Sequence, residues 1–184
     1  MGNNIRASGG ECIFVRQLEQ LVLGQAVLCA ERAVGNEPFV VLLADDFLIY
    51  DGDGTTADLV RSFEASSKTQ LSVMEVNGPD ISKYGVILPG SGPSAVAGLV
   101  EKPDVDNAPS NFAGIGRYVL TPGIFDILRH HQVGTGGELQ LADAINAPAA
   151  TNAVAAATLH GRRFAFGHVQ GDLATTLSVT YPHL

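Results

Sequence analysis

The sequence predicts an α/β fold in which a sheet carries an added β-rich lobe. In the first third of the chain, an apolar run rich in β-branched residues at positions 39–43 lies between two segments with helical spacing. In the middle of the chain, several strand-like runs follow one another, separated by glycine, proline, serine and asparagine. Strands that first alternate with helices and then cluster are typical of this fold class.

The elements expected before residue 68 follow from periodicity. Residues 12–17, CIFVRQ, are predicted to form a short strand, and residues 24–34 a helix, because small and apolar residues recur on one helical face. Residues 39–43, FVVLL, are apolar at every position, which is typical of a parallel strand covered by helices on both faces. A helix through residue 66 is predicted to begin at Thr55 or Thr56, either of which can cap it.

The later elements are predicted to be short strands and then helices. Strands are expected at residues 70–76, 84–90, 95–103 and 111–120. A helix is predicted over residues 121–131, TPGIFDILRHH, which begins with a threonine cap and a proline and ends in basic residues. Residues 136–145 are predicted to open another helix, whereas the periodicity of the alanine-rich residues 148–159 leaves both helix and strand open.

The composition excludes several classes of protein. A chain of 184 residues with 46% hydrophobic content predicts one domain, and a formal net charge of −8 argues against a nucleic-acid partner. The N-terminus lacks the cationic and then apolar order of a secretory signal, and no apolar run has the length that spans a bilayer. We therefore expect a cytoplasmic protein without a membrane partner. Cys12 and Cys29 lack metal-ligand spacing and are predicted to be reduced and buried.

Two neighbouring carboxylates, Asp45 and Asp46, follow the apolar run at residues 39–43. Carboxylates at the carboxyl end of a strand suit Mg²⁺, which keeps water ligands and uses one or two protein carboxylates together with substrate phosphates. The alternative is a turn in which the aspartate side chains bond to their own backbone.

An acid and a base, Glu101 and Lys102, end another apolar run, which Pro103 stops. Neighbouring strand residues point to opposite faces, so the two side chains can serve one ligand only at a strand end or a twist. There a carboxylate accepts hydrogen bonds from sugar hydroxyls, and an ammonium group supplies a point charge to phosphate. The alternative is a solvated charge pair on an exposed strand.

Two further features have modest meaning by themselves. Gly24 precedes a helical segment, where a glycine lets the backbone approach a base or phosphate, although a plain turn is the favoured interpretation. The sequence has neither a GxSxG motif nor a Walker motif, which argues against common acyl-transfer and P-loop chemistry.

An ordered series of motifs over residues 13–145 resembles the bacterial UTP–glucose-1-phosphate uridylyltransferases, or UDP-glucose pyrophosphorylases, of the sugar nucleotidyltransferase superfamily. The series comprises VRQ, LGQAVLCA, GNEPFVVLLADD, YGVI, GLVEKP, APSNFAGIGRYVLTPGIF and GTGGELQLADAI. The resemblance implies a Rossmann-like mixed sheet with a β-rich sugar-binding lobe. It also implies that UTP and glucose 1-phosphate react to give UDP-glucose and pyrophosphate.

Such a transfer needs positioning and charge neutralisation more than covalent chemistry. The resemblance implies that Asp45 binds Mg²⁺, that Gly85 and Glu101 contact the glucose, and that Lys102 contacts its phosphate. Asp45 and Lys102 would be the catalytic residues of this chain.

Four other positions take their roles from the resemblance alone. Gln17 and Gly24 would help to recognise the uracil base. Asn111 and Glu138 would line or support the sugar lobe.

The sequence departs from the family pattern near both ends. The family begins with a glycine-rich GxGTRxxPxTK loop that wraps the triphosphate, whereas here MGNNIRASGGE leads almost directly into residues 12–17. We therefore expect one domain over residues 1–184 that lacks this loop segment, so its fold would be an incomplete nucleotidyltransferase. Ala165 and Val169 stand where the family has a second metal-binding aspartate and a lysine.

These departures predict weak activity from this chain alone. Truncation is also expected to expose sheet edges and apolar helix faces, which favours a homo-oligomer. The alternative function is a non-catalytic subunit that binds a sugar phosphate or nucleotide sugar, or that regulates a complete enzyme. A related thymidylyltransferase is a further alternative.

Overall fold

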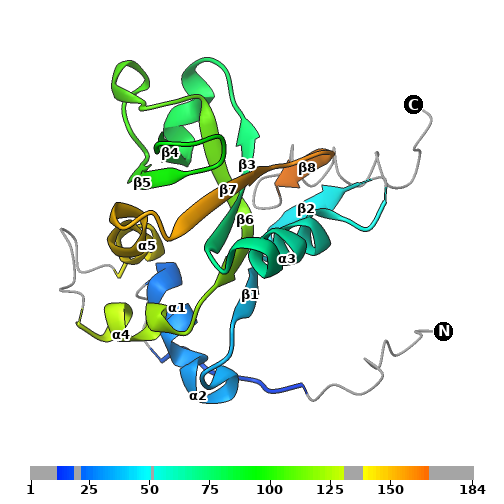
Figure 1. The fold of residues 1–184 in the computed structure, drawn as a ribbon, viewed down its shortest axis with the longest axis vertical. Coiled ribbons are helices and arrows are strands. Elements are labelled where there is room, and N and C mark those ends of the chain that lie inside the picture. Colours follow the sequence, from blue (N-terminus) through cyan, green and yellow to red (C-terminus); the bar gives the residue numbers. More distant parts are fainter. Residues whose placement is uncertain (1–11, 19–21, 51, 131–138, 166–184) are drawn as a thin grey trace.

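The computed structural model describes residues 12–18, 22–50, 52–130 and 139–165, and it confirms the predicted mixed α/β class (Figure 1). The helices are α1 (Val22–Cys29), α2 (Glu31–Val34), α3 (Thr55–Ser66), α4 (Gly123–His130) and α5 (Leu141–Ala150), with 3₁₀ turns η1 (Pro79–Lys83) and η2 (Val105–Asn107). The strands are β1 (Phe39–Leu42), β2 (Asp46–Ile49), β3 (Thr69–Glu75), β4 (Gly85–Pro89), β5 (Val96–Glu101), β6 (Phe112–Leu120), β7 (Val154–Thr158) and β8 (Arg162–Ala165).

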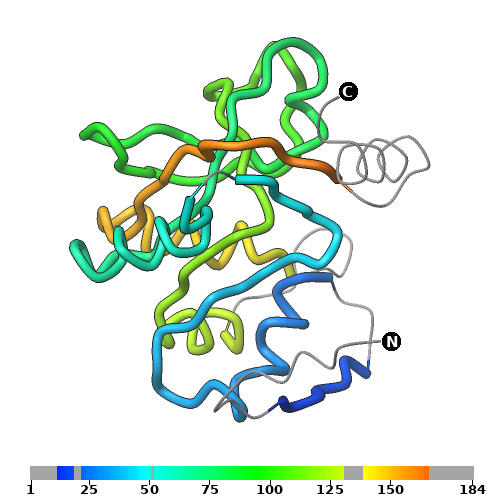
Figure 2. The backbone as a smooth tube through the Cα atoms, turned by 90° about the vertical axis from the view of Figure 1, so that its right-hand side faces the viewer, coloured from blue at the N-terminus to red at the C-terminus, as the bar shows by residue number. Residues whose placement is uncertain are grey.

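Within the described residues, six strands form one open mixed sheet in the order β5-β4-β6-β3-β7, and β1 also pairs with β6. The β3–β7 pair is parallel, and the other pairs of this sheet are antiparallel. Strands β2 and β8 form a separate antiparallel ribbon. Figure 2 shows β4 and β5 at one end of the molecule and the helices α1, α2 and α4 at the other.

Strand β6 changes its partner along its length. Strand β3 pairs with β6 over both halves of β6, so β1 and β4 share the opposite edge. Strand β1 pairs with Leu120 through Arg117, and β4 pairs at Ala113. The sheet therefore splits between these two positions.

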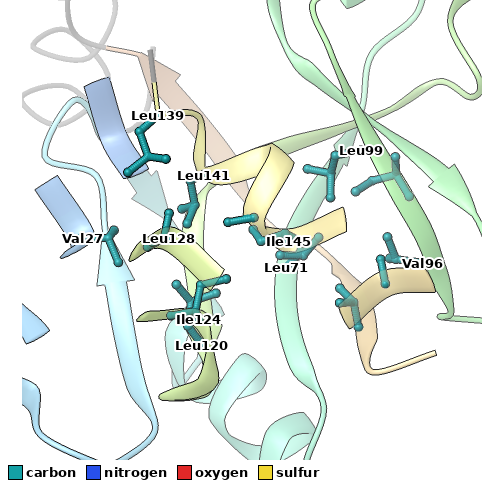
Figure 3. Close-up of a cluster of buried hydrophobic side chains, with 14 of the residues drawn as sticks. Val27, Leu71, Val96, Leu99, Leu120, Ile124, Leu128, Leu139, Leu141 and Ile145 are labelled. Atoms are coloured by element: carbon teal, nitrogen blue, oxygen red, sulfur yellow. The ribbon is translucent and has the colours of Figure 1, made fainter. Parts of the chain in front are cut away.

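The main core lies between the sheet and the helices α1, α4 and α5 (Figure 3). Leu71 of β3, Leu120 of β6 and Ile145 of α5 are almost completely buried in it. The rings of Phe39 and Phe125 stack with their centroids 5.0 Å apart, which joins β1 to α4. Helix α3 packs on β3, β6 and β7 and contributes the buried Leu59.

Strand β5 is held against α5 by one side chain. Asn146 accepts a hydrogen bond from the Leu99 N–H at 2.6 Å and donates one to the Leu99 carbonyl at 3.1 Å. This amide satisfies both backbone groups of Leu99, as a neighbouring strand would. The contact fixes the strand that ends at Glu101.

Two predicted strands differ from the structure. Residues 12–17 form no strand, and Phe14 is 93% exposed, because an apolar segment without a pairing edge has no ladder to join. Strand β1 is antiparallel to β6 and alternates between half-buried and exposed residues, so it is not covered on both faces. Cys12 is exposed and Cys29 is half-buried, so the predicted burial of both cysteines is wrong, although both thiols are free.

The predicted strands β3 to β6 and the helices α3 and α4 occur within a few residues of their predicted bounds, but the threonine cap of α3 is wrong, and two strands were not predicted. Of the helix predicted from residue 136, residues 136–138 are outside the described residues, and α5 begins at Leu141. The predicted helix at residues 24–34 is interrupted at Ala30 into α1 and α2, and the N-cap of α3 is Gly54, without a side-chain cap. The open stretch 148–159 ends α5 and then forms β7. Strands β2 and β8 had no sequence prediction. Among the described helices, none has the length and apolarity to cross a bilayer.

Candidate functional site

A cavity of about 250 Å³ lies at the split in the sheet. One side, the β1–β2 wall, consists of Leu43, Asp45 and Asp46, and the opposite side, the β4–β5 wall, consists of Tyr84, Gly85 and Glu101. Strand β6 lies between the two walls, and the beginning of α5 closes another side. The polar lining residues are Asp45, Asp46, Lys83, Tyr84, Glu101, Tyr118, Gln140 and Arg163.

The structure brings together Asp45, Gly85 and Glu101, three residues predicted from sequence to form a site. Asp45 is exposed in the turn between β1 and β2, and Glu101 is the last residue of β5. Gly85 pairs with Glu101 across the β4–β5 ladder, and a Cβ on Gly85 would lie 3.0 Å from Glu101 Oε2. The missing side chain therefore leaves room for the Glu101 carboxylate at the cavity.

Lys102 breaks the alternation of the strand that precedes it. Its φ of +44° is left-handed, a conformation uncommon for a residue other than glycine, and its N–H donates to the Tyr84 carbonyl at 3.0 Å. Lys102 Nζ lies 3.9 Å from Glu101 Oε1, so the two head groups are on the same side despite being neighbours. Lys102 stands beside the cavity and is not one of its lining residues.

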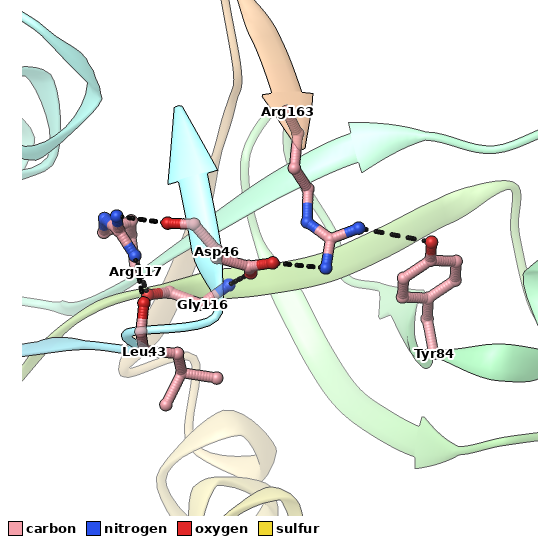
Figure 4. A network of polar contacts seen from close by, with 6 residues as sticks. All are labelled: Leu43, Asp46, Tyr84, Gly116, Arg117 and Arg163. Atoms are coloured by element: carbon pink, nitrogen blue, oxygen red, sulfur yellow. Dashed lines mark hydrogen bonds and ion pairs between the residues drawn. The ribbon is translucent and has the colours of Figure 1, made fainter. Parts of the chain in front are cut away.

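Asp46 is buried beneath the cavity and has a structural set of partners (Figure 4). Its Oδ2 accepts a hydrogen bond from the Gly116 N–H at 2.6 Å, and its Oδ1 forms an ion pair with Arg163 Nη2. A Cβ on Gly116 would lie 2.7 Å from Oδ2 and 2.6 Å from Leu43 Cβ, so this approach requires glycine. The Asp46 carboxylate thus bonds to the backbone N–H of Gly116 in β6, at the position where β1 and β4 separate.

Arg163 connects both walls of the cavity. It contacts Asp46 on one side, and on the other its Nη1 donates to the Tyr84 hydroxyl at 3.2 Å, with the guanidinium 5.3 Å from the Tyr84 ring centroid. Burial lowers the pKa of Arg163, but the hydrogen bond to Asp46 and the charge of Asp46 raise it by a larger amount. The pKa of Arg163 therefore lies above its ordinary value. The arginine remains a permanent cation.

A second arginine holds the turn that carries Asp45. Arg117 of β6 donates to the Leu43 carbonyl at 3.0 Å and to the Asp46 carbonyl at 2.6 Å. The backbone on both sides of Asp45 is therefore fixed by one guanidinium, while the Asp45 side chain stays exposed. Figure 4 shows Arg117 and Arg163 on opposite sides of Asp46.

Tyr118 lines the cavity from β6, and sequence reasoning did not single it out. Burial, followed by the negative charges of Asp46 and Glu101, raises its pKa from 10.0 to about 12. Its hydroxyl keeps its proton at neutral pH and can donate a hydrogen bond to a ligand oxygen. Its position in the run GIGRYVL predicted that Tyr118 is in a strand, but not that its side chain is on the face that lines the cavity.

The carboxylates fit a magnesium ion only in part. The described residues contain no cluster of three histidine, cysteine, aspartate or glutamate side chains that could hold a metal. Asp46 is committed to Gly116 and Arg163, whereas Asp45 presents an exposed carboxylate to the cavity. One carboxylate suits Mg²⁺ when substrate phosphates and water supply the other ligands.

The other residues predicted from sequence are not lining residues of the cavity or are outside the described residues. Gln17 donates to the Val22 carbonyl at 3.2 Å, and Asn111 donates to Glu75 Oε1 at 2.7 Å. Gly24 lies in α1, where a Cβ would stand 2.2 Å from the Leu139 carbonyl oxygen, so close packing explains this glycine. None of these three lines the cavity. Glu138 lies outside the described residues.

Comparison with known proteins places these features in a family context. The nucleotidyl transferase family model matches residues 11–162. A UTP–glucose-1-phosphate uridylyltransferase of Pseudomonas aeruginosa is 40% identical over 97% of this chain and 66% of its own length. Another, from Streptococcus pyogenes serotype M1, is 41% identical over 92% of this chain and 59% of its own length. The chain thus spans less than two thirds of these curated relatives.

Solved structures agree with the sequence relatives. An apo UDP-glucose pyrophosphorylase superposes with a TM-score of 0.87 at 35% identity, over 92% of this chain and 64% of that one. A UDP-glucose pyrophosphorylase complexed with UDP-glucose gives 0.85 at 34% identity, over 92% and 66%. A UTP-bound UGPase from Acinetobacter baumannii gives 0.81 at 35% identity, over 92% and 60%.

Proposed function

Because this chain belongs to the nucleotidyl transferase family, we propose that it joins glucose 1-phosphate to the uridylyl group of UTP, giving UDP-glucose and pyrophosphate. The observation that supports this most is the meeting of Asp45 with Gly85 and Glu101 in one cavity. Relatives that are 40% and 41% identical carry the corresponding name. We keep the cytoplasmic location and the self-association inferred from the sequence as parts of the proposal.

The β4–β5 wall would hold the sugar phosphate. Glu101 would accept hydrogen bonds from glucose hydroxyls, in the space that Gly85 leaves open. Lys102, held on the same side by its left-handed backbone, would pair with the phosphate. A cation beside a carboxylate suits a ligand that presents hydroxyls and a phosphate on neighbouring carbons.

The β1–β2 wall would hold the phosphate chain through Mg²⁺ at Asp45. When bound, the ion would neutralise the charge that develops on the phosphate oxygens. Arg117 and Asp46 would keep the Asp45 backbone in place, so little reorganisation is needed during transfer. Tyr118 would add a neutral hydrogen-bond donor between the two walls.

Roles for the remaining predicted residues stay proposals. Gln17 and Gly24 would contribute to the uracil side, and Asn111 and Glu138 to the sugar lobe. For Gly24, close packing against the Leu139 carbonyl accounts for the glycine without a ligand, so an effect of substitution there would have to be separated from misfolding.

Binding and turnover together test the proposal. The full chain is titrated with UDP-glucose by calorimetry and then incubated with UTP, glucose 1-phosphate and Mg²⁺, while UDP-glucose is followed by chromatography. We expect UDP-glucose to bind, and Asp45→Asn to lower any synthesis roughly 100-fold, as expected for lost charge stabilisation. Asp104→Asn, which removes an exposed carboxylate that does not line the cavity, should have no effect. A chain that makes no UDP-glucose would refute the proposed reaction, and binding of UDP-glucose without synthesis would favour the non-catalytic alternative.

A further inference from the structure

Arg163 lies between the β1–β2 wall and the β4–β5 wall, which come from separate segments of the sequence. Its ion pair reaches Asp46, the neighbour of Asp45 in the β1–β2 wall. Its hydrogen bond reaches the hydroxyl of Tyr84, the neighbour of Gly85 in the β4–β5 wall. Figure 4 shows the guanidinium between the two partners.

Each partner is connected to a residue with a proposed substrate role. The Tyr84 carbonyl accepts the Lys102 N–H at 3.0 Å, so Tyr84 also fixes the backbone that follows Glu101. The Asp46 carboxylate accepts the Gly116 N–H, which ties the β1–β2 wall to β6. A displacement of either end of the Arg163 bridge would therefore move one wall relative to the other.

We propose that Arg163 is a positioning residue that sets the separation between the β1–β2 wall and the β4–β5 wall by bridging Asp46 and Tyr84. The proposal rests on the proposed function for its effect on substrate binding, but the bridge itself can be tested without a ligand. The side chain is 15% exposed, and two of its nitrogens are engaged with protein partners. Arg163 also lines the cavity, and the role proposed here is the one that it performs through Asp46 and Tyr84.

Two features of arginine suit this role. Its planar, forked guanidinium offers donors in two directions at once, whereas lysine has a single point charge. A phosphate-transfer site is sensitive to such geometry, because a misplacement of about 1 Å can cost roughly 100-fold in rate. A lysine at this position should keep the contact with Asp46 and lose the one with Tyr84.

The experiment compares variants of the full chain by hydrogen exchange and calorimetry. Arg163→Lys retains a charge for Asp46, Tyr84→Phe removes the hydroxyl, and Arg163→Met removes the bridge. Arg162→Met is the matched control, because Arg162 is exposed on the same strand and does not line the cavity. Amide exchange is read at residues 43–47 and 83–86, and UDP-glucose affinity is measured with and without Mg²⁺.

We expect Arg163→Lys and Tyr84→Phe to raise exchange roughly tenfold at residues 83–86 while residues 43–47 stay protected. Both variants should bind UDP-glucose about tenfold more weakly, and Mg²⁺ should improve the binding less than it does in the wild type. Arg163→Met should raise exchange at residues 43–47 and at residues 83–86. If this variant fails to fold, the results for Arg163→Lys and Tyr84→Phe test the bridge.

Unchanged exchange at residues 83–86 in both milder variants would overturn the bridge. Wild-type UDP-glucose affinity in Arg163→Lys and Tyr84→Phe, despite raised exchange, would overturn the positioning role. If exchange at residues 83–86 rises in the two milder variants but the wild-type chain does not bind UDP-glucose, the bridge is supported. That result would count against the proposed function instead.

Discussion

Two adjacent aspartates have different environments and therefore different expected roles. Asp46 is 4% exposed and is engaged by Gly116 and Arg163, whereas Asp45 is exposed at the cavity. A buried charge that loses its partner is costly, while an exposed carboxylate without partners costs little to remove. The sequence ADD gives no sign of this difference.

We expect Asp46→Ala to lower the free energy of unfolding by about 3–5 kcal/mol, because it leaves Arg163 without its counter-charge. Asp45→Ala should change it by less than about 0.5 kcal/mol, because its side chain is exposed. Urea unfolding of the two variants checks both values. Equal stability losses would contradict the assignment of Asp46 as the structural member of the pair.

The raised pKa of Tyr118 predicts a change in stability at alkaline pH. The folded-state pKa of about 12 exceeds the ordinary value of 10.0, so between these values the unfolded chain loses the proton and the folded chain keeps it. The contribution of Tyr118 is full below pH 10 and is lost as the pH rises toward 12, by about 1.4 kcal/mol per pH unit. Unfolding free energies of the wild type and Tyr118→Phe, measured across this range, should differ in slope. Parallel curves would show that the site does not perturb Tyr118.

Some individual residues of the candidate site were predictable from the sequence. The resemblance assigned Asp45 to Mg²⁺ and Glu101 to the glucose, and these two residues line one cavity. Arg163 and Tyr118 were not expected, because pairing across β2 and β8 and the inward face of β6 are set by tertiary structure. The left-handed backbone of Lys102 likewise has no signal in the residue type.

The exchange of partners along β6 creates the cavity. Strands β1 and β4 use the same edge of β6, and the Asp46 carboxylate occupies the gap between them at Gly116. This arrangement depends on the absence of a side chain at Gly116, where the backbone of β6 meets Leu43 and Asp46.

Gly116→Ala is therefore expected to destabilise the protein by about 1–3 kcal/mol, as overpacking does. Its Cβ would lie 2.6 Å from Leu43 Cβ, a contact that requires the β1–β2 wall to move. Gly123→Ala is the control, because a Cβ there has no atom within 4 Å and the residue begins α4. Thermal unfolding that gave equal or higher stability for Gly116→Ala than for Gly123→Ala would contradict this packing.

Element types were predictable where periodicity was strong. The strands β3 to β6 and the helices α3 and α4 follow from apolar runs and turn residues. The short strands β2 and β8 were missed because DFLI and RRFA carry charges that look like loop signals until their pairing is known. Residues 12–17 show the converse error, since β-rich composition without a neighbouring strand does not produce one.

Across the molecule, the main sheet carries β1 and the β4–β5 wall of the site, and the separate β2–β8 ribbon contributes Asp46 and Arg163. Strands β4 and β5 extend beyond the helices α1, α2 and α4, while β1 lies near them, so the split between β1 and β4 opens between two parts of the molecule (Figure 2). The sequence predicted an α/β sheet with a β-rich extension. The antiparallel pairing and the edge position of β1 were not predictable, because an apolar run is compatible with a buried parallel strand or an exposed edge.

We propose that Glu101 and Lys102 act together on the hexose and its phosphate at this split. Calorimetric titration of the full chain with UDP-glucose tests it most directly, using Glu101→Gln and Lys102→Met, with Asp106→Asn and Lys68→Met as matched controls that do not line the cavity. Each site variant is expected to weaken binding roughly 10-fold to 100-fold, the range for a lost hydrogen bond to a charged group, while the controls bind as the wild type does. Wild-type affinity in both folded site variants would contradict the claim.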